Sequence, residues 1–195
     1  SSWPKSTPEI NEDLSRQWLT LVHRSRQLAR DNEWAQRWLI QLQDNVLGAV
    51  GVRLQMRVAK STRPGEQDEL ANRLIESEWA RFAARGACEV SGRLSWRELE
   101  KLALLSLAKD GELLYRIRRG PRQGPFGVRL QLLPATLLDA NLSRDYQGRR
   151  VRMGVEIDDE GLPVAYWLVA ARSGESPGST AVIGRHVRLP ASEVR

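Results

Sequence analysis

The sequence predicts an α+β fold in which an N-terminal helical arm is followed by helices packed on mainly antiparallel strands and hairpins. Three observations predict it: apolar residues recur at helical spacing over 10–46, a capped helix runs directly into a strand over 88–119, and later stretches alternate apolar and polar residues around turns. We expect a flexible tail over 1–9, the arm over 10–47 and an α+β domain over 48–195. The last fifteen residues begin another strand without a closing signal, so we expect this domain to be truncated at its C-terminus.

The arm is predicted from a stripe of apolar residues at 3.6 residues per turn. Trp18, Val22 and Leu39 belong to this stripe. Asp31 and Asn32 are both good N-cap residues, so the arm is either one long helix or two helices, the second starting near Glu33.

The stretch VRLQMRV, residues 52–58, alternates apolar and polar residues, which predicts a strand with one solvated face. Residues 67–84 return to helical spacing. In the helix and strand of 88–119, Ser95 and Glu98 form a capping-box pattern, and Asp110-Gly111 ends the helix. The lone cysteine, Cys88, is expected to be a buried structural thiol.

Two hairpins are predicted in the second half of the chain. Residues 112–119 and 128–133 flank the loop GPRQGPFG, and residues 151–157 and 164–169 flank the turn DDEGLP. In the first hairpin Tyr115 and Ile117 are expected to face the core, and the arginines that alternate with them are expected to form a basic surface.

The net charge of +6 is concentrated in residues 111–152, which contain nine arginines and three acidic residues. A guanidinium donates two parallel hydrogen bonds to a phosphate or carboxylate, although an arginine-rich codon usage would give the same composition. The candidates for contact with DNA or an acidic partner are Arg116, Arg118, Arg119 and Arg122. The candidates for a subunit interface are Trp18, Trp34 and Trp38, and Trp34 lies off the apolar face of its helix.

No catalytic, cofactor-binding or metal site is predicted. The two histidines lack partners at metal-ligand spacing, and no P-loop, GxGxxG or GxSxG motif occurs. Asp158, Asp159 and Glu160 are possible Mg²⁺ ligands of a nuclease, but these residue types are also common turn formers. No apolar run is long enough to span a membrane, so no membrane partner is expected.

The order of these features resembles the portal proteins of lambda-type tailed phages. The matching stretches are RSRQLARDNEWAQRWLIQLQDNVLGAVGVRLQ, WARFAARGACEVSGRLSWRELEKLALLSLAKDGELLYRIRRG, LQLLPATLLDANL, RMGVEIDDEGLPVAYWL and HVRLPASEV. At Glu33-Trp34 such proteins often carry Asn-Pro, so the resemblance supports a sharp helix break less well there.

The resemblance implies that this chain is the N-terminal, wing portion of a non-enzymatic portal protein without cofactors. Such proteins form a ring, usually of twelve copies, at one capsid vertex of the virion, after assembly in the host cytoplasm. Double-stranded DNA passes through the ring independently of sequence, driven by the terminase, and capsid and head-tail joining proteins bind it. The alternatives are a stand-alone basic DNA-binding module and a Mg²⁺-dependent nuclease.

Overall fold

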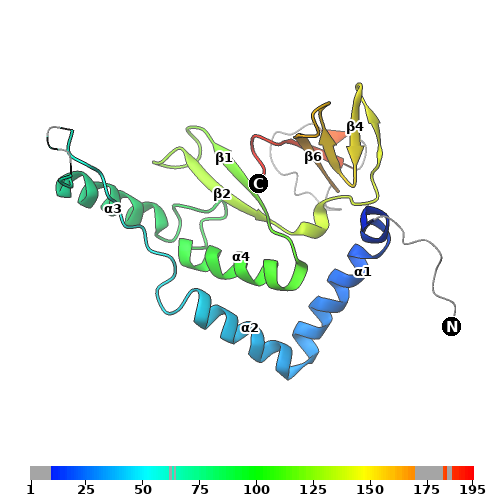
Figure 1. Ribbon diagram of the computed structural model, residues 1–195, viewed down its shortest axis with the longest axis horizontal. Coiled ribbons are helices and arrows are strands. Elements are labelled where there is room, and N and C mark those ends of the chain that lie inside the picture. The colour runs from blue at the N-terminus through cyan, green and yellow to red at the C-terminus, as the bar shows by residue number, and fades with distance from the viewer. Residues whose placement is uncertain (1–9, 62, 64, 170–181, 184–185) are drawn as a thin grey trace. The chain divides into compact units, whose positions relative to one another are not determined.

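Helices precede strands in the computed structural model, which describes residues 10–61, 63, 65–169, 182–183 and 186–195 (Figure 1). The helices are α1 (Ile10–Asp31), α2 (Glu33–Val46), α3 (Glu69–Ala83) and α4 (Trp96–Asp110). The remaining elements are β1 (Leu114–Arg119), β2 (Val128–Leu133), the 3₁₀ helix η1 (Ala135–Leu137), β3 (Arg144–Tyr146), β4 (Arg149–Arg152), β5 (Val155–Ile157), β6 (Pro163–Val169), β7 (Val182–Ile183) and β8 (His186–Pro190). The predicted α+β class is confirmed, and the predicted tail lies outside the described residues.

The chain divides into two compact units. The first comprises Ser1–Ala35, Ser106–Tyr115 and Leu133–Arg195, and the second comprises Gln36–Leu105 and Arg116–Leu132. The helices of the predicted arm are therefore divided between the units, and the predicted domain boundary at 47/48 stays a prediction.

The break between α1 and α2 is made by Asn32. Its side-chain oxygen accepts a hydrogen bond from the Ala35 amide at 3.0 Å, which satisfies one of the free amides in the first turn of α2. Of the two interpretations of the arm, two helices is confirmed, although the chain lacks the Asn-Pro pair.

The core of the first unit joins α1 to a six-stranded sheet. The strand order is β3-β4-β5-β6-β8-β7, and every pairing in this sheet is antiparallel. The core consists of buried apolar residues from α1, the sheet and the segments that flank them: Trp18, Val22, Leu114, Leu133, Ala135, Ala140, Leu168, Val187, Leu189 and Val194.

The predicted hairpin around DDEGLP is confirmed as β5 and β6, but residues 151–157 are not one strand. A turn at Met153-Gly154, with φ of 49° and 80°, separates β4 from β5. A Cβ on Gly154 would lie 2.9 Å from the Asp139 carbonyl oxygen, so this close approach requires glycine. Alternation of side chains alone does not reveal such a turn.

An ion pair in the first unit connects α1 with the C-terminal end of α4. The Arg26 guanidinium donates to both carboxylate oxygens of Asp110, at 2.8 and 2.7 Å. An acidic side chain at a helix C-terminus is unfavourable beside the negative end of the helix dipole, and the arginine offsets that charge.

In the second unit, residues 52–58 do not form the predicted strand, and that prediction is wrong. The Met56 amide donates to the Glu76 carboxylate at 2.9 Å, and the Val58 amide donates to Asn72 Oδ1 at 2.8 Å. Side chains of α3 thus take acceptor positions that a neighbouring strand would occupy in a sheet.

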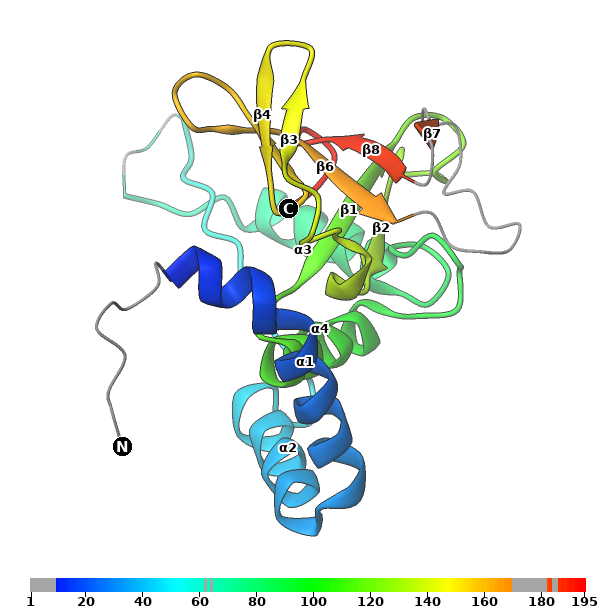
Figure 2. The ribbon, with the colours of Figure 1, turned by 90° about the vertical axis from the view of Figure 1, so that its right-hand side faces the viewer.

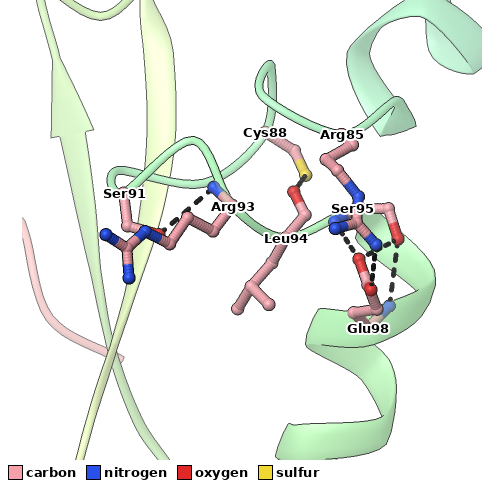
Figure 3. A network of polar contacts seen from close by, with 7 residues as sticks. All are labelled: Arg85, Cys88, Ser91, Arg93, Leu94, Ser95 and Glu98. Atoms are coloured by element: carbon pink, nitrogen blue, oxygen red, sulfur yellow. Dashed lines mark hydrogen bonds and ion pairs between the residues drawn. The ribbon is translucent and has the colours of Figure 1, made fainter.

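The capping box of α4 is confirmed. The Ser95 amide donates to Glu98 Oε2 at 2.7 Å, the Glu98 amide donates to Ser95 Oγ at 3.4 Å, and Arg85 pairs with the same carboxylate (Figure 3). The hydrogen bond from the Ser95 amide lowers the pKa of Glu98. Cys88 is fully buried as predicted, with its thiol facing the Leu94 carbonyl, and burial raises its pKa.

Side chains from the N-terminal part of α4 hold the turn that follows α2. Arg97 donates to the Gly48 carbonyl, and Glu100 accepts the Val52 amide at 3.2 Å and Trp96 Nε1 at 2.7 Å. Gly51 has φ +77°, and a Cβ there would lie 2.3 Å from Glu100 Oε2. A side chain at residue 51 would require Glu100 and Arg97 to shift, and the positive φ favours glycine in any case.

We expect Gly51→Ala to lower the free energy of unfolding by more than Gly161→Ala. Gly161 has a similar φ of +85° but nothing within 4 Å of its Cβ position, so its substitution costs only the roughly 1–2 kcal/mol of a left-handed residue. Urea denaturation of both variants measures the difference. Equal losses would show that Glu100 and Arg97 move aside without cost.

Candidate functional site

The predicted hairpin around GPRQGPFG is confirmed as β1 and β2, and hydrogen bonds within the loop fix its shape. The Gly120 amide donates to the Gly127 carbonyl at 2.9 Å, and the Gly127 amide donates to the Gly124 carbonyl at 3.1 Å. The Arg129 guanidinium lies 3.2 Å from the position of a Cβ on Gly124 and donates to the Gly86 carbonyl. The loop is therefore a compact structure rather than an open excursion.

Phe126 anchors this loop within the second unit. Its ring lies edge-on to Phe82 with centroids 5.4 Å apart, and the Arg81 guanidinium lies 5.9 Å from its centroid. Phe82 in turn contacts Trp79 and Trp96, so the loop is connected to α3 and α4 through a cluster of aromatic rings.

The four predicted arginines differ in exposure. Arg119 and Arg122 are exposed and Arg118 is half-buried, whereas Arg116 is only 3% exposed. The expectation that Arg116 belongs to a basic surface is therefore corrected. Alternation assigns side chains to two faces of a strand, but it does not decide which face the rest of the chain covers.

A second group of exposed arginines, which the sequence alone does not predict, lies on the β3–β4 hairpin. Figure 2 shows the course of this hairpin. Arg144, Arg150 and Arg152 are exposed there, and Arg144 lies 4.8 Å above the Trp167 ring. The available signal was Gln147-Gly148, a turn pair with φ of 49° and 79°.

Glu156, 1% exposed, is the centre of a buried ionic cluster in the first unit. Arg188 donates to both of its carboxylate oxygens, at 2.7 and 2.8 Å, Trp167 Nε1 donates at 3.2 Å and Arg149 at 3.4 Å. The hydrogen bonds from Arg188 are the main cause that lowers the pKa of Glu156. In the alternation of residues 151–157 Glu156 falls on the polar side, and no local signal in the sequence marks it as buried.

The three tryptophans predicted at a subunit interface are placed differently. Trp34 and Trp38 are 84% and 52% exposed on α2, while Trp18 is 8% exposed and belongs to the core of the first unit. The interface expectation for Trp18 is therefore corrected, because its ring is already packed within its own chain.

The acidic turn 158–160 is organised by its own backbone. Asp158 Oδ1 accepts the amides of Glu160 at 3.0 Å and Leu162 at 2.8 Å, which is the geometry of a turn-forming aspartate. Among the described residues no group of three or more His, Cys, Asp or Glu side chains is arranged to hold a metal ion.

Comparison with known proteins gives the family. Residues 1–195 match the family described as "Phage portal protein, lambda family". The chain belongs to this family. The portal chain is also 36% identical over 178 residues to the "Probable portal protein" of Halomonas phage phiHAP-1. That alignment covers 90% of the portal chain and 33% of the relative, so the portal chain spans about a third of the length of this relative.

In the described part of the portal chain, none of the helices is both long enough and apolar enough to cross a membrane. The candidate functional features of the chain are two exposed basic hairpins, an exposed pair of tryptophans on α2 and a buried ionic cluster.

We expect Glu156→Gln to lower the free energy of unfolding by about 1–3 kcal/mol at pH 7, because it removes the counter-charge and weakens the charge-assisted hydrogen bonds of the half-buried Arg188 guanidinium. The matched control is Glu160→Gln in the exposed turn, which should change it by less than about 0.5 kcal/mol. Chemical denaturation of both variants tests this, and a loss in Glu156→Gln no greater than in the control would contradict it.

The same cluster sets a pH dependence. Because the folded-state pKa of Glu156 is lowered, its contribution is present above the unfolded value of about 4.3 and is lost as pH falls through the folded value. The unmodified chain should therefore lose stability below about pH 4.3 more steeply than Glu156→Gln. If the free energy of unfolding of the two proteins falls equally with pH below about pH 4.3, Glu156 is not the source of this pH dependence.

Proposed function

We propose that this chain is part of a structural portal ring at one vertex of the capsid of a tailed phage or prophage. The ring would form the channel for DNA packaging and ejection and the head-tail connection. The observation that carries the proposal is the match of the whole chain to the lambda portal family. The α+β fold and the exposed tryptophans on α2 are compatible with a subunit that buries surface on assembly.

The oligomeric state, the binding partners and the location of the protein are also proposed. We propose a homo-oligomeric ring, of about twelve copies as the resemblance implies, located in the virion and assembled in the host cytoplasm. Terminase, capsid and head-tail joining proteins would bind the complete ring. The role is structural, without catalysis.

The exposed arginines of the β1–β2 hairpin are proposed to contact DNA or an acidic partner. Arg119 and Arg122 are exposed and lie near a loop fixed by Phe126, so little conformational freedom would be lost when they bind. Such contacts neutralise phosphates and release counterions without reading sequence.

The two other functions considered are not supported. The family match gives no support to a stand-alone DNA-binding module. The carboxylate of Asp158 is engaged in its own turn, which gives no support to a nuclease.

Electron microscopy of the full-length gene product tests the main proposal. Rings with a central hole are expected. A protein that stays monomeric at high concentration would overturn it.

Substitution of the tryptophans of α2 distinguishes an effect on ring assembly from an effect on folding. We expect Trp34→Ala and Trp38→Ala to reduce ring formation with little effect on thermal stability, because both side chains are exposed in the single chain. Trp18→Ala should instead lower the free energy of unfolding by about 3–5 kcal/mol, because it opens a cavity in the core. Sedimentation together with thermal denaturation measures both effects. Rings unaffected by either α2 substitution would contradict the interface role.

If the arginines of the β1–β2 hairpin contact DNA, their removal should change the salt dependence of the affinity for duplex DNA. If both arginines contact phosphates, Arg119→Ala with Arg122→Ala should reduce the slope of log K against log salt for duplex DNA by about 1.8, at about 0.9 per phosphate contact. The matched control is Arg73→Ala, an exposed arginine of α3 that pairs with Glu69 at 3.7 Å. An unchanged slope in the double variant would contradict DNA contact by this hairpin.

A further inference from the structure

The backbone of Arg195 pairs with the backbone of Tyr115, and both residues belong to the first unit. The Tyr115 amide donates to the Arg195 carbonyl at 2.9 Å, and the Arg195 amide donates to the Tyr115 carbonyl at 3.0 Å. Two residues that exchange both hydrogen bonds are a hydrogen-bonded pair of an antiparallel ladder. This pair therefore sets the direction and the register of the chain at Arg195 against β1.

Val194 holds the same stretch of chain in the core of the first unit. Its side chain is 1% exposed and belongs to the cluster of buried apolar residues that also contains Leu114 of β1. The approach of residues 194–195 to β1 thus depends on buried apolar contact as well as on backbone hydrogen bonds.

The edge of β1 that Arg195 occupies is open at Leu113. Backbone groups two residues apart point to the same edge of an extended chain, so the amide and carbonyl of Leu113 point the same way as those of Tyr115. Among the described residues neither of these groups of Leu113 makes a hydrogen bond, although Leu113 is half-buried. The other edge of β1 is already paired with β2.

We propose that the residues following Arg195 in the full-length portal chain cover this open edge as a strand antiparallel to β1. Continuation of the observed register places the first of these residues opposite Leu114 and the second opposite Leu113. The inference rests on one part of the proposed function, namely that the chain is the first portion of a longer portal protein, and its alignment covers only 33% of the relative.

A strand from another molecule is a poorer occupant of this edge. Such a strand would have to stop before Tyr115, because both backbone groups of Tyr115 already serve Arg195. The residues after Arg195 displace nothing, and their covalent linkage makes the pairing intramolecular, at an effective concentration in about the millimolar range. A third strand also stabilises a sheet that otherwise consists of β1 and β2 alone.

The added strand would connect the remaining part of the portal subunit to the base of the β1–β2 hairpin. β1 leads directly from this edge to Arg119 and to the loop with Arg122, the residues proposed to contact DNA or an acidic partner. The strand would therefore help to fix the orientation of that hairpin in the assembled protein.

Paired cysteines in the full-length portal protein test the register. Leu113→Cys with a cysteine at the second residue after Arg195 should form a disulfide within one chain on mild oxidation. Directly opposite residues of a hydrogen-bonded pair have Cα atoms about 5.5 Å apart, which a disulfide can span. The matched control has the second cysteine at the first residue after Arg195, whose side chain points to the other face.

Peptide mass mapping under non-reducing conditions identifies the linked residues. A disulfide in the first protein and not in the control is expected. Equal disulfide in both proteins, or disulfide in neither, would overturn the proposed strand. A disulfide between two chains would show that another copy fills the edge, which also overturns the proposal.

Hydrogen exchange gives a readout that needs no cysteine. Proline at the second residue after Arg195 removes the amide that would donate to the Leu113 carbonyl, whereas proline at the first residue removes an amide that points away from β1. We expect the Leu113 amide to exchange about fivefold faster in the first variant than in the second, as for one lost hydrogen bond. In the unmodified protein this amide should be protected, and exchange at the rate of an unstructured peptide would contradict the pairing.

Failure of this inference and failure of the proposed function are distinguishable. Rings that form without the disulfide would overturn the strand and leave the portal ring intact. A disulfide within the chain of a protein that never forms rings would overturn the ring and leave the strand, because the strand forms within one chain.

Discussion

The carboxylate of Glu100 is the contact on which the second unit depends. It accepts the amide of Val52 and the indole N–H of Trp96, and in this position it would have to shift to admit a Cβ at residue 51. The hydrogen bond to Val52 is exposed, and in it a helix side chain supplies the acceptor that a neighbouring strand would supply in a sheet. The start of the segment after α2 is therefore tied to α4 by side-chain contacts.

In the first unit the side chain with the most polar contacts to other strands is Glu156. Its buried carboxylate is surrounded by Arg188, Arg149 and Trp167, which come from three different strands of one sheet. A buried charge is tolerated only when its partners are fixed, so the cluster requires the register of β4, β5, β6 and β8 to be correct together. Arg144 lies over the Trp167 ring and extends the cluster to the exposed β3–β4 hairpin.

The chain exposes two chemically different kinds of surface. Trp34 and Trp38 on α2, and Val52 in the segment that follows α2, present large apolar side chains to solvent. The basic hairpins are a separate surface with different chemistry. Assembly would bury the first kind of residue, whereas the arginines remain suited to a polyanion or an acidic protein.

The sequence by itself determined the α+β class, the two predicted hairpins around their turns, the capping box at Ser95 and the family, because these depend on local spacing and on the order of short motifs. It left open whether Asn32 breaks the arm, since a cap and a continuous helix are both locally acceptable. Only the tertiary structure decided that Arg116 and Glu156 are buried and that residues 52–58 have no partner strand among the residues that the structure describes. Burial and pairing depend on segments distant in the chain, and alternation alone carries no information about them.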